Sequence, residues 1–451
     1  MKAFYIGIIF VILSLKHILV SSTKSSVSST SFCTKEDHSC KNAIPINKMN
    51  QARYDFYRIY YVHLDTEEQV KVFQDLEAKS DSHTFYGHAR HTDQKLTIMV
   101  AAHKIADFVD LLELYKVEHR VLTYNFQEKI DRQNLDVQPK NISPNRFDWD
   151  HYFHLETIYD WLALQAKDHK LELIEMGNSH EGIPIKGIKF ISNPSNPTVF
   201  IESGIHAREW IAPATATFLL NELLTSTDNK IKKYAQKLNW VIFPVVNPDG
   251  YKYTFEKDRM WRKNRRFFGL CRGVDLNRNF PFHWNETGSS DDQCAYDYAG
   301  PEGASEDETK CIIKFIEDNI SKLNIKTYIA LHSFSQLIMF PYGFTPEKVE
   351  NYNDLKAIGD KAVESIKEVT GKVYKSGSLY ETIYPSSGGS KDWSHAIGKI
   401  PITYTFELRG APDSEDLFIL PASEIRDTGK EAVAAIMTIV EEADKRGYYN
   451  N

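Results

Sequence analysis

The chain has 451 residues, of which 42% are hydrophobic and 12% aromatic, which is enough to bury the cores of two or three domains. The net charge of −7 is spread along the chain without long single-sign runs, which argues against nucleic-acid binding as the main function. After the N-terminus, no segment approaches the ~18 uninterrupted apolar residues of a membrane span.

The first residues, MKAFYIGIIFVILSLKHILVSS, have the organisation of a secretory signal. A positive charge at Lys2 precedes an apolar run from Ala3 to Leu15, and Lys16 and His17 interrupt that run. Because the run is too short and too broken to span a bilayer, we interpret residues 1–21 as a cleaved signal rather than an anchor. This predicts a secreted, extracellular protein without a membrane segment, in which residues 22–50 form a polar N-terminal segment.

Five cysteines leave one without a partner. In an oxidising compartment, Cys33 can pair with Cys40 in the polar N-terminal segment, and Cys271 can pair with Cys294 across a loop. Cys311 lies on a predicted helical face beside apolar residues, so we expect a buried thiol rather than a reactive one.

Residues 51–128 alternate between strand and helix patterns in the order βαββαβ, which is the ferredoxin-like order. We therefore expect a small α+β domain that is complete in itself. Its predicted strands lie at 57–64, near 83–86, at 96–101 and at 118–127, and its predicted helices lie at 67–78 and 105–117.

Residues 129–146 are polar, contain two prolines and several basic residues, and lack an apolar period. They predict an exposed linker, where proteolysis concentrates. A small domain ahead of a linker that a trypsin-like protease can cut suggests a propeptide, although an ordinary interdomain linker has the same composition. The candidate cleavage positions are Lys129, Arg132, Lys140 and Arg146.

Residues 147–451 alternate between helices and continuous apolar strands. This pattern predicts an α/β domain with a mixed, mostly buried sheet and helices on both faces. In such sheets, ligands bind at the carboxyl ends of the strands. The clearest strands lie at 185–192, 198–205, 240–246, 327–333 and 401–408, and the clearest helices lie at 156–168 and 212–224.

The segment TVFIESGIHAREW leads from an apolar strand into His206 and Glu209. A histidine and a glutamate three residues apart can bind one face of a Zn²⁺ ion, which in catalytic sites has three protein ligands. The same spacing recurs in polar context at 169–172 and 283–286, so the spacing alone is weak evidence. A third ligand is available at His332, where another apolar strand ends, although a lone strand-end histidine is more often an ordinary polar residue.

Several further motifs occur in a fixed order along about 300 residues. Together with the small N-terminal domain, they resemble the secreted zinc metallocarboxypeptidases of the pancreatic A/B type. The resemblance implies a monomeric zymogen with one Zn²⁺ and a digestive role, acting on peptide C-termini. The motifs are HAREW at 206–210, NPDGY at 247–251, DRMWRKNRR at 258–266, CRGVDLNRNF at 271–280, LHSFSQ at 331–336, FPYG at 340–343, SSGGSKDW at 386–393 and TFELR at 405–409.

The resemblance assigns the metal site and its surroundings. Asp275 is expected to orient a histidine ligand, a role that metal-bound histidines usually require. The family also implies a disulfide between Cys271 and Cys294. The implied zinc ligands are His206, Glu209 and His332.

The resemblance also assigns the catalytic and substrate-binding groups. Glu407 is expected to act as the general base, and Arg262 to stabilise the developing oxyanion. A guanidinium fork suits the substrate's terminal carboxylate because it can bind both oxygens at once. The implied substrate-binding residues are Arg208, Asn277, Arg278, Tyr384 and Lys391.

One position departs from the family's pattern, and the role of another stays open. Arg259 either lines an outer subsite or belongs to a solvated basic surface. Phe334 stands where relatives commonly have tyrosine, so a hydroxyl contact with the substrate is expected to be absent. Glu407 and Arg262 argue against a non-catalytic zinc-binding protein, since binding alone needs neither.

In the family that the chain resembles, the residue at the position of Lys391 in SSGGSKDW lies at the bottom of the pocket for the C-terminal side chain. A buried ammonium needs a negative partner, and a substrate glutamate or aspartate supplies one. Alternatively, Lys391 pairs with Asp392 or extends its charge into water, and either arrangement leaves a pocket for aliphatic or aromatic residues. The positive charge disfavours basic substrates.

Overall fold

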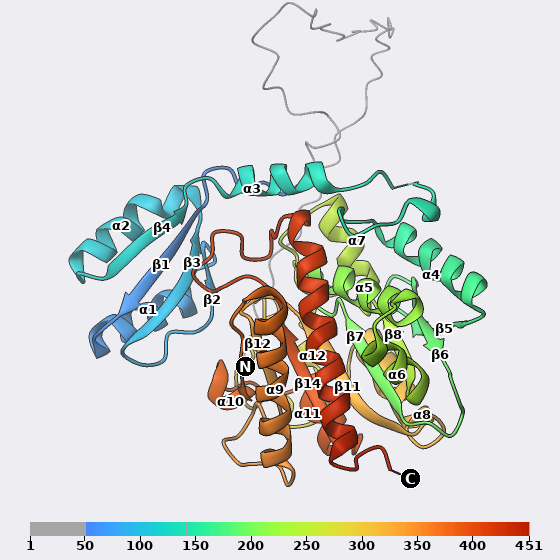
Figure 1. The fold of residues 1–451 in the computed structure, drawn as a ribbon. Coiled ribbons are helices and arrows are strands. Elements are labelled where there is room, and N and C mark those ends of the chain that lie inside the picture. The colour runs from blue at the N-terminus through green and yellow to red at the C-terminus, as the bar shows by residue number, and fades with distance from the viewer. Residues whose placement is uncertain (1–50, 141, 451) are drawn as a thin grey trace, which may run out of the picture. The chain divides into compact units, whose positions relative to one another are not determined.

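The structure is a computed structural model that describes residues 51–140 and 142–450 (Figure 1). The predicted signal and the predicted Cys33–Cys40 pair lie outside the described residues. Among the described residues, none of the helices is long and apolar enough to span a bilayer.

The small N-terminal domain forms the predicted βαββαβ unit. Its four antiparallel strands are arranged in the order β2-β3-β1-β4. Phe73 of the first helix and Phe108 of the second pack with Val62 in one core, so both helices cover the same face of the sheet. The elements are β1 (Arg58–Leu64), α1 (Glu67–Lys79), β2 (His83–Tyr86), β3 (Gln94–Val100), η3 (Ala102–Lys104), α2 (Ile105–Leu114) and β4 (Glu118–Thr123).

The opposite face of this sheet packs against the large domain. Ile59 and Met99 are buried in one hydrophobic cluster with Phe334 and Phe418 of the large domain. The small domain therefore covers residues that lie next to the strand ends of the large sheet.

The structure differs from the sequence-based prediction at the start of the linker. Residues Phe126–Gln133 form α3, followed by a short turn, η4 (Asn134–Asp136). Phe126 and Ile130 are four residues apart, so they lie on one face of the helix, and both are buried. Two apolar residues are too few to reveal a period in a polar segment, which is why the sequence did not predict the helix.

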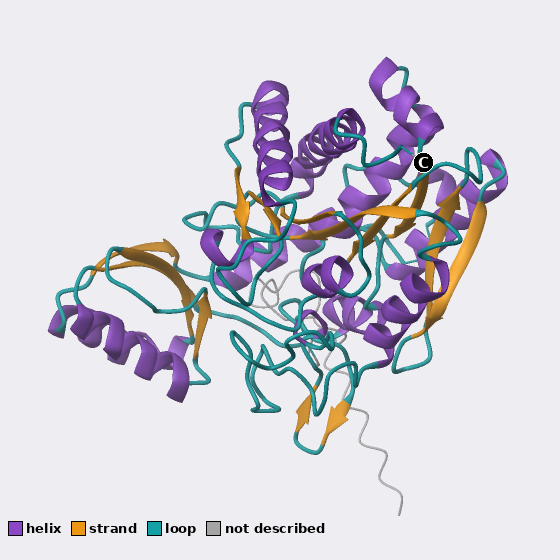
Figure 2. Ribbon diagram, turned by 90° about the horizontal axis from the view of Figure 1, so that it is seen from below, coloured by secondary structure: helices purple, strands orange, loops and turns teal. Residues whose placement is uncertain are grey.

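The large domain is built on an eight-stranded mixed sheet, seen nearly edge-on in Figure 2. The strand order is β13-β12-β14-β11-β7-β8-β6-β5, and the central run from β14 to β8 is parallel. The strands are β5 (Glu172–Asn178), β6 (Pro184–Phe190), β7 (Thr198–Ser203), β8 (Asn239–Phe243), β11 (Ile325–His332), β12 (Leu337–Phe340), β13 (Lys375–Ser378) and β14 (Ile402–Glu407).

Helices cover both faces of this sheet, which confirms the predicted fold class. One face packs against α4 (Leu155–His169), α5 (Ile211–Thr225), α6 (Asn229–Lys237), α9 (Tyr352–Thr370) and α12 (Ile425–Lys445). The other packs against α8 (Asp307–Asn319), where Cys311 is a half-buried free thiol, and α11 (Ser390–Ala396). The remaining elements are η5 (Pro144–Arg146), α7 (Pro248–Glu256), η6 (Leu276–Arg278), α10 (Leu379–Thr382) and η7 (Ala422–Glu424).

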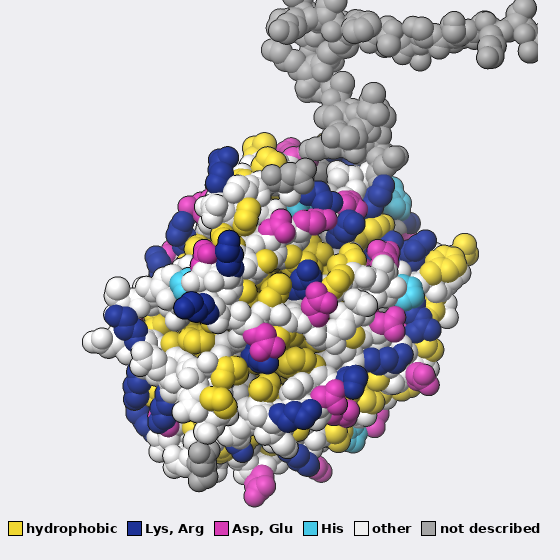
Figure 3. All heavy atoms as spheres, turned by 90° about the vertical axis from the view of Figure 1, so that its right-hand side faces the viewer, with side chains coloured by type: hydrophobic (Ala, Val, Ile, Leu, Met, Phe, Trp, Pro, Cys, Tyr) yellow, Lys and Arg dark blue, Asp and Glu magenta, His cyan; other side chains and the backbone are white. Residues whose placement is uncertain are grey.

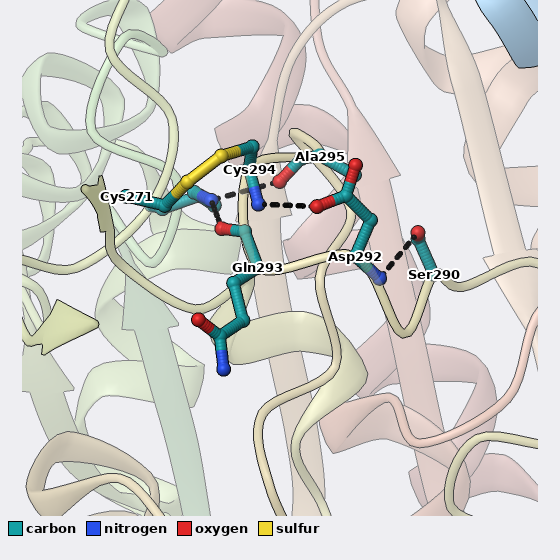
Figure 4. Close-up of a disulfide and its surroundings, with 7 residues drawn as sticks. Cys271, Ser290, Asp292, Gln293, Cys294 and Ala295 are labelled. Atoms are coloured by element: carbon teal, nitrogen blue, oxygen red, sulfur yellow. Dashed lines mark hydrogen bonds between the residues drawn. A yellow bond between two sulfur atoms is a disulfide. The ribbon is translucent and has the colours of Figure 1, made fainter. Parts of the chain in front are cut away.

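A short hairpin, β9 (Phe267–Phe268) and β10 (Cys271–Arg272), is joined to a neighbouring loop by a disulfide (Figure 4). The Cα atoms of Cys271 and Cys294 are 5.0 Å apart, within the usual range for a disulfide. The Lys263 ammonium donates to the carbonyls of Gln293 and Ala295 at 3.0 and 2.8 Å. The loop is therefore held to the protein body by a covalent bond and by two charge-assisted hydrogen bonds.

On the face shown in Figure 3, basic and acidic side chains are interspersed. Such a mixture produces no uniform field over that face, and a uniform field is what steers a highly charged ligand. The charges on this face therefore do not mark a binding site for a highly charged ligand.

Candidate active site

The carboxyl ends of the central parallel strands bring the predicted residues together. Entirely buried β7 leads through Gly204 to His206, and β11 ends at His332. β14 ends at Glu407, which lies directly opposite His332 in the parallel register. Three segments that are far apart in sequence thus deliver polar side chains to one edge of the sheet.

His206, Glu209 and His332 form a buried cluster that can hold a metal ion. The two Nδ1 atoms are 3.1 Å apart, and each lies close to one oxygen of Glu209, at 2.8 Å from His206 and 3.2 Å from His332. Tetrahedral Zn²⁺ with ~2.0–2.1 Å bonds to nitrogen separates its ligand atoms by about 3.3 Å. Two imidazoles and a carboxylate at this spacing fit a zinc site.

Asp275 joins this cluster to an arginine. Its Oδ1 is 3.1 Å from Nε2 of His206, the nitrogen that faces away from the cluster. Its Oδ2 accepts from Nε and Nη2 of Arg262 at 2.9 and 2.8 Å. Burial opposes the charged form of Asp275, but Arg262 and His206 hold its pKa well below the usual value. Arg262 remains protonated because, although burial lowers its pKa, Asp275 and Glu209 raise it.

Glu407 lies beside the cluster as a carboxylate with a perturbed pKa. Burial raises the pKa of Glu407 to about 8, with His332 lowering it and Glu209 raising it. A cation bound by the cluster would favour the charged carboxylate and lower this pKa. Glu407 is therefore a carboxylate whose proton affinity would respond directly to a cation in the cluster.

Asn277 and Arg278 lie in η6, on the wall of a nearby cavity of about 50 Å³. The Arg278 side chain is oriented by a hydrogen bond in which its Nε donates to the carbonyl of Gly288 at 2.7 Å. Its Nη2 lies 3.3 Å from the Tyr384 hydroxyl. Gly388 has a positive φ of 68°, and a side chain there would collide with the carbonyl of Arg278. The glycine therefore lets the 386–393 segment approach Arg278 closely.

Lys391 lines the same cavity and is 4% exposed. Its ammonium contacts Oδ1 of Asp392, and Oδ2 of Asp392 accepts from the backbone N–H of Gly343 at 2.8 Å. The alternative in which Lys391 extends its charge into water is therefore wrong, because α11 begins at Ser390 and the first turn is buried. Of the two alternatives to a free ammonium, pairing with Asp392 is the one observed.

A larger cavity of about 460 Å³ continues past Arg262 and Tyr384 under the small domain. The ring of His88 meets the Tyr384 ring edge-on at 4.8 Å, and the guanidinium of Arg90 lies 5.7 Å from the same ring. Arg208 also lines this cavity, with its guanidinium 4.0 Å from the Phe418 ring. Arg208, Arg262 and Tyr384, three of the predicted site residues, thus line one cavity.

Other expectations are corrected or extended by the structure. Arg259 is neither on a solvated surface nor in either of these cavities, because it is 5% exposed and its Nη atoms donate to the carbonyls of Arg208 and Phe418. Sequence reasoning missed His88 and Arg90, and no local pattern marks them, because their contacts with Tyr384 are made only in the folded chain.

Comparison with known proteins agrees with this geometry. A family model described as zinc carboxypeptidase matches residues 158–435. The chain belongs to the zinc carboxypeptidase family. A second model, described as carboxypeptidase activation peptide, matches residues 60–133 of the small domain. This metallocarboxypeptidase is therefore a zymogen with an activation domain, and His206, Glu209 and His332 are placed to bind its zinc.

Relatives cover nearly the whole chain. A protein named zinc carboxypeptidase A 1 from Anopheles gambiae is 43% identical over 411 residues, which are 90% of this carboxypeptidase and 94% of the relative. Thrombin activatable fibrinolysis inhibitor matches the fold with a TM-score of 0.79 at 31% identity, covering 87% of this chain and all of that one. A carboxypeptidase A from Helicoverpa armigera matches with a TM-score of 0.77 at 28% identity, with 87% and 98% covered.

Proposed function

We propose that this zinc carboxypeptidase releases single residues from peptide C-termini with a preference for glutamate or aspartate. The observation that carries the preference is the burial of Lys391 in the cavity that also contains Arg278. An acidic C-terminal residue has two carboxylates, and this cavity presents two cationic side chains to receive them.

Asn277 and Arg278 would hold the terminal carboxylate of the substrate. Arg278 presents a planar fork that is already oriented by Gly288, so little side-chain entropy is lost on binding. A chain that continues beyond the scissile residue has no carboxylate for this clamp. The clamp therefore favours an exopeptidase over an endopeptidase or amidase.

The bound zinc ion would act as a Lewis acid toward the scissile carbonyl and make water more acidic. Glu407, beside His332, would accept a proton from the attacking water and deliver it to the leaving amine. Arg262, held by Asp275, would donate to the oxyanion. Tyr384 would close over the bound residue, and Arg208 would contact the peptide further upstream. A non-catalytic zinc-binding role would use neither Glu407 nor Arg262.

A second candidate is the release of aliphatic or aromatic residues. The contact between Lys391 and Asp392 supports it, because the ammonium already has a counterion before any substrate binds. We favour the acidic preference because an ammonium has three donors, and Asp392 engages one of them.

We further propose that the protein is secreted as a monomer through the signal at residues 1–21. In this proposal, a trypsin-like protease cuts between the activation domain and the enzyme, and the enzyme serves digestion. The activation domain and the basic linker support activation by cleavage.

The test is to activate the full-length protein with trypsin and to compare peptides ending in Glu, Leu and Arg. We expect kcat/KM in the order Glu, Leu, Arg. In Lys391→Met, kcat/KM for the Glu peptide should fall by about 30-fold, the equivalent of ~2 kcal/mol for one desolvated charge pair. Lys314→Met, at an exposed position on α8, is the control. Equal or faster hydrolysis of the Leu peptide by the wild type would refute the acidic preference.

A further inference from the structure

We propose that Asp392 is a specificity-determining residue, an internal counterion that competes with the substrate's side-chain carboxylate for Lys391. It would thereby limit how strictly the pocket selects acidic residues. This inference rests on the acidic preference proposed above.

The contacts show that Asp392 is held in this position from two sides. One carboxylate oxygen contacts the Lys391 ammonium, and the other accepts from the Gly343 backbone in the loop after β12. The two side chains are only 5% and 3% exposed, so water contributes little to either charge. The ion pair is thus a fixed part of the pocket and not a surface contact.

A charge count shows what this pair does to selection. The cavity contains Arg278 and Lys391 as cations and Asp392 as an anion, while the charge of Arg262 is matched by Asp275. A neutral C-terminal residue adds one carboxylate and balances the charges. An acidic residue adds two, so that its side chain and Asp392 must share Lys391.

The consequence concerns neutral substrates. When a leucine side chain occupies the pocket, Lys391 keeps Asp392 as its partner, so no buried ammonium is left uncompensated. The large cost of an unpaired buried charge, which would otherwise exclude leucine, is not incurred. Asp392 therefore allows neutral C-terminal residues into the pocket, whereas Lys391 gives the pocket its preference for acidic ones.

The titratable groups around this pair define its pH behaviour. Burial lowers the pKa of Lys391, Asp392 raises it, and Arg278 lowers it. Burial is the main cause of the raised pKa of Tyr342 and of the lowered pKa of His395. The charge of Asp392 acts on both groups and raises each pKa. Removal of the Asp392 charge should therefore lower the pKa of Lys391.

The experiment compares trypsin-activated wild type with Asp392→Asn. Asparagine has nearly the same volume and keeps an oxygen that can accept from Gly343, but it removes the charge. We expect the ratio of kcat/KM for Glu over Leu to rise roughly tenfold or more, mainly because the Leu reaction slows. The Leu reaction of this variant should recover as the pH rises and Lys391 loses its proton. A merely structural role for Asp392 would not produce this recovery.

A double-mutant cycle isolates the coupling. Added to Lys391→Met, the Asp392→Asn change should no longer slow the Leu reaction, because no buried ammonium is left to lose its counterion. An unchanged or lower ratio in the single variant Asp392→Asn would overturn the proposal.

The wild type gives an independent test that needs no variant. If Asp392 satisfies Lys391, the wild type should prefer Glu over Leu by less than about a hundredfold. Rejection of Leu by more than about a thousandfold would overturn the role of Asp392 while leaving the acidic preference intact. Preference for Leu would instead overturn the proposed function itself, so the two failures are distinguishable.

Discussion

Asp275 contacts both a proposed zinc ligand and the proposed oxyanion donor. One of its oxygens faces Nε2 of His206, and the other accepts two hydrogen bonds from Arg262. A single carboxylate therefore sets the orientation of the histidine and the position of the guanidinium. Loss of its charge should affect metal binding and transition-state stabilisation together.

In Asp275→Asn, we expect zinc to bind about 10- to 100-fold more weakly, the usual effect of losing a group that orients a metal ligand. Competition with a chelator of known affinity measures the change. Asp318→Asn, at an exposed position on α8, is the control. Unaltered zinc affinity would show that Asp275 does not support His206.

The variant Glu407→Gln should lose catalytic rate while it keeps its metal ion. We expect zinc content to remain at one ion per chain while kcat falls by about 10²- to 10⁴-fold, because the amide cannot accept the proton. Metal analysis and steady-state kinetics on one preparation give both numbers. Activity within tenfold of the wild type would require another base.

At the residue level, the sequence predicted the residues of the metal cluster because ordered motifs carry them. It also raised the pairing of Lys391 with Asp392, since the two are neighbours in the chain. The alternative that placed Arg259 on a solvated basic surface was wrong, because composition alone places a basic run at the surface. The folded chain instead buries Arg259 among backbone carbonyls and stacks it on Trp210 at 3.7 Å.

At the level of elements, the longer buried strands were predictable, whereas buried β12, which has only four residues, and the edge strand β5 were not. β7 and β14 read as continuous apolar runs because both of their faces are covered. β5 lies at the edge of the sheet, contains Glu172 and Glu175, and was not predicted. Its strand conformation depends on pairing with β6, which a local pattern cannot reveal.

The helix α3 reduces the number of candidate positions for the activating cleavage. Lys129 and Arg132 lie within it, and the Lys129 ammonium also pairs with Glu415 and Asp416. Proteases need an extended, accessible segment, so we expect trypsin to cut after Lys140 or Arg146. N-terminal sequencing of the activated enzyme should show a chain that begins at residue 141 or 147. A first cut after Lys129 or Arg132 would contradict this.

The disulfide of the β9–β10 hairpin makes a separate prediction. Its cysteines are 23 residues apart, and a cross-link of this span restricts the unfolded chain by about 3 kcal/mol in the loop-entropy model. The double variant Cys271→Ser, Cys294→Ser should lose about this much unfolding free energy in urea titrations. Cys311→Ser, which removes the half-buried free thiol on α8, is the control. An unaltered unfolding free energy would contradict this prediction.

At the level of the whole molecule, the sequence could not predict that the activation domain packs over the cavity beside the proposed active site. The activation domain meets the enzyme through contacts between residues roughly 200 to 330 positions apart, such as Tyr86 with Phe334 and Arg120 with Asp413. The sequence predicted both domains, but the face of the small sheet that packs on the large one follows only from the assembled chain.

Removal of zinc should affect both activity and stability. A chelator should abolish hydrolysis, and added Zn²⁺ should restore it. A ligand that binds only the folded state at about a thousand times its Kd adds ~4 kcal/mol of stability, so Tm should fall when the ion is removed. Calorimetry with and without chelator tests this. Full activity in excess chelator would refute the zinc mechanism.

Lys391 and Asp392 lie in the first turn of α11, whereas the zinc cluster comes from the segment after β7 and the end of β11. In the proposed enzyme, recognition of the departing residue and cleavage of the bond thus belong to different elements. Single substitutions in this one short helix can therefore change which C-terminal residue is preferred. The residues of the zinc cluster need not change with them, so specificity can evolve separately from catalysis.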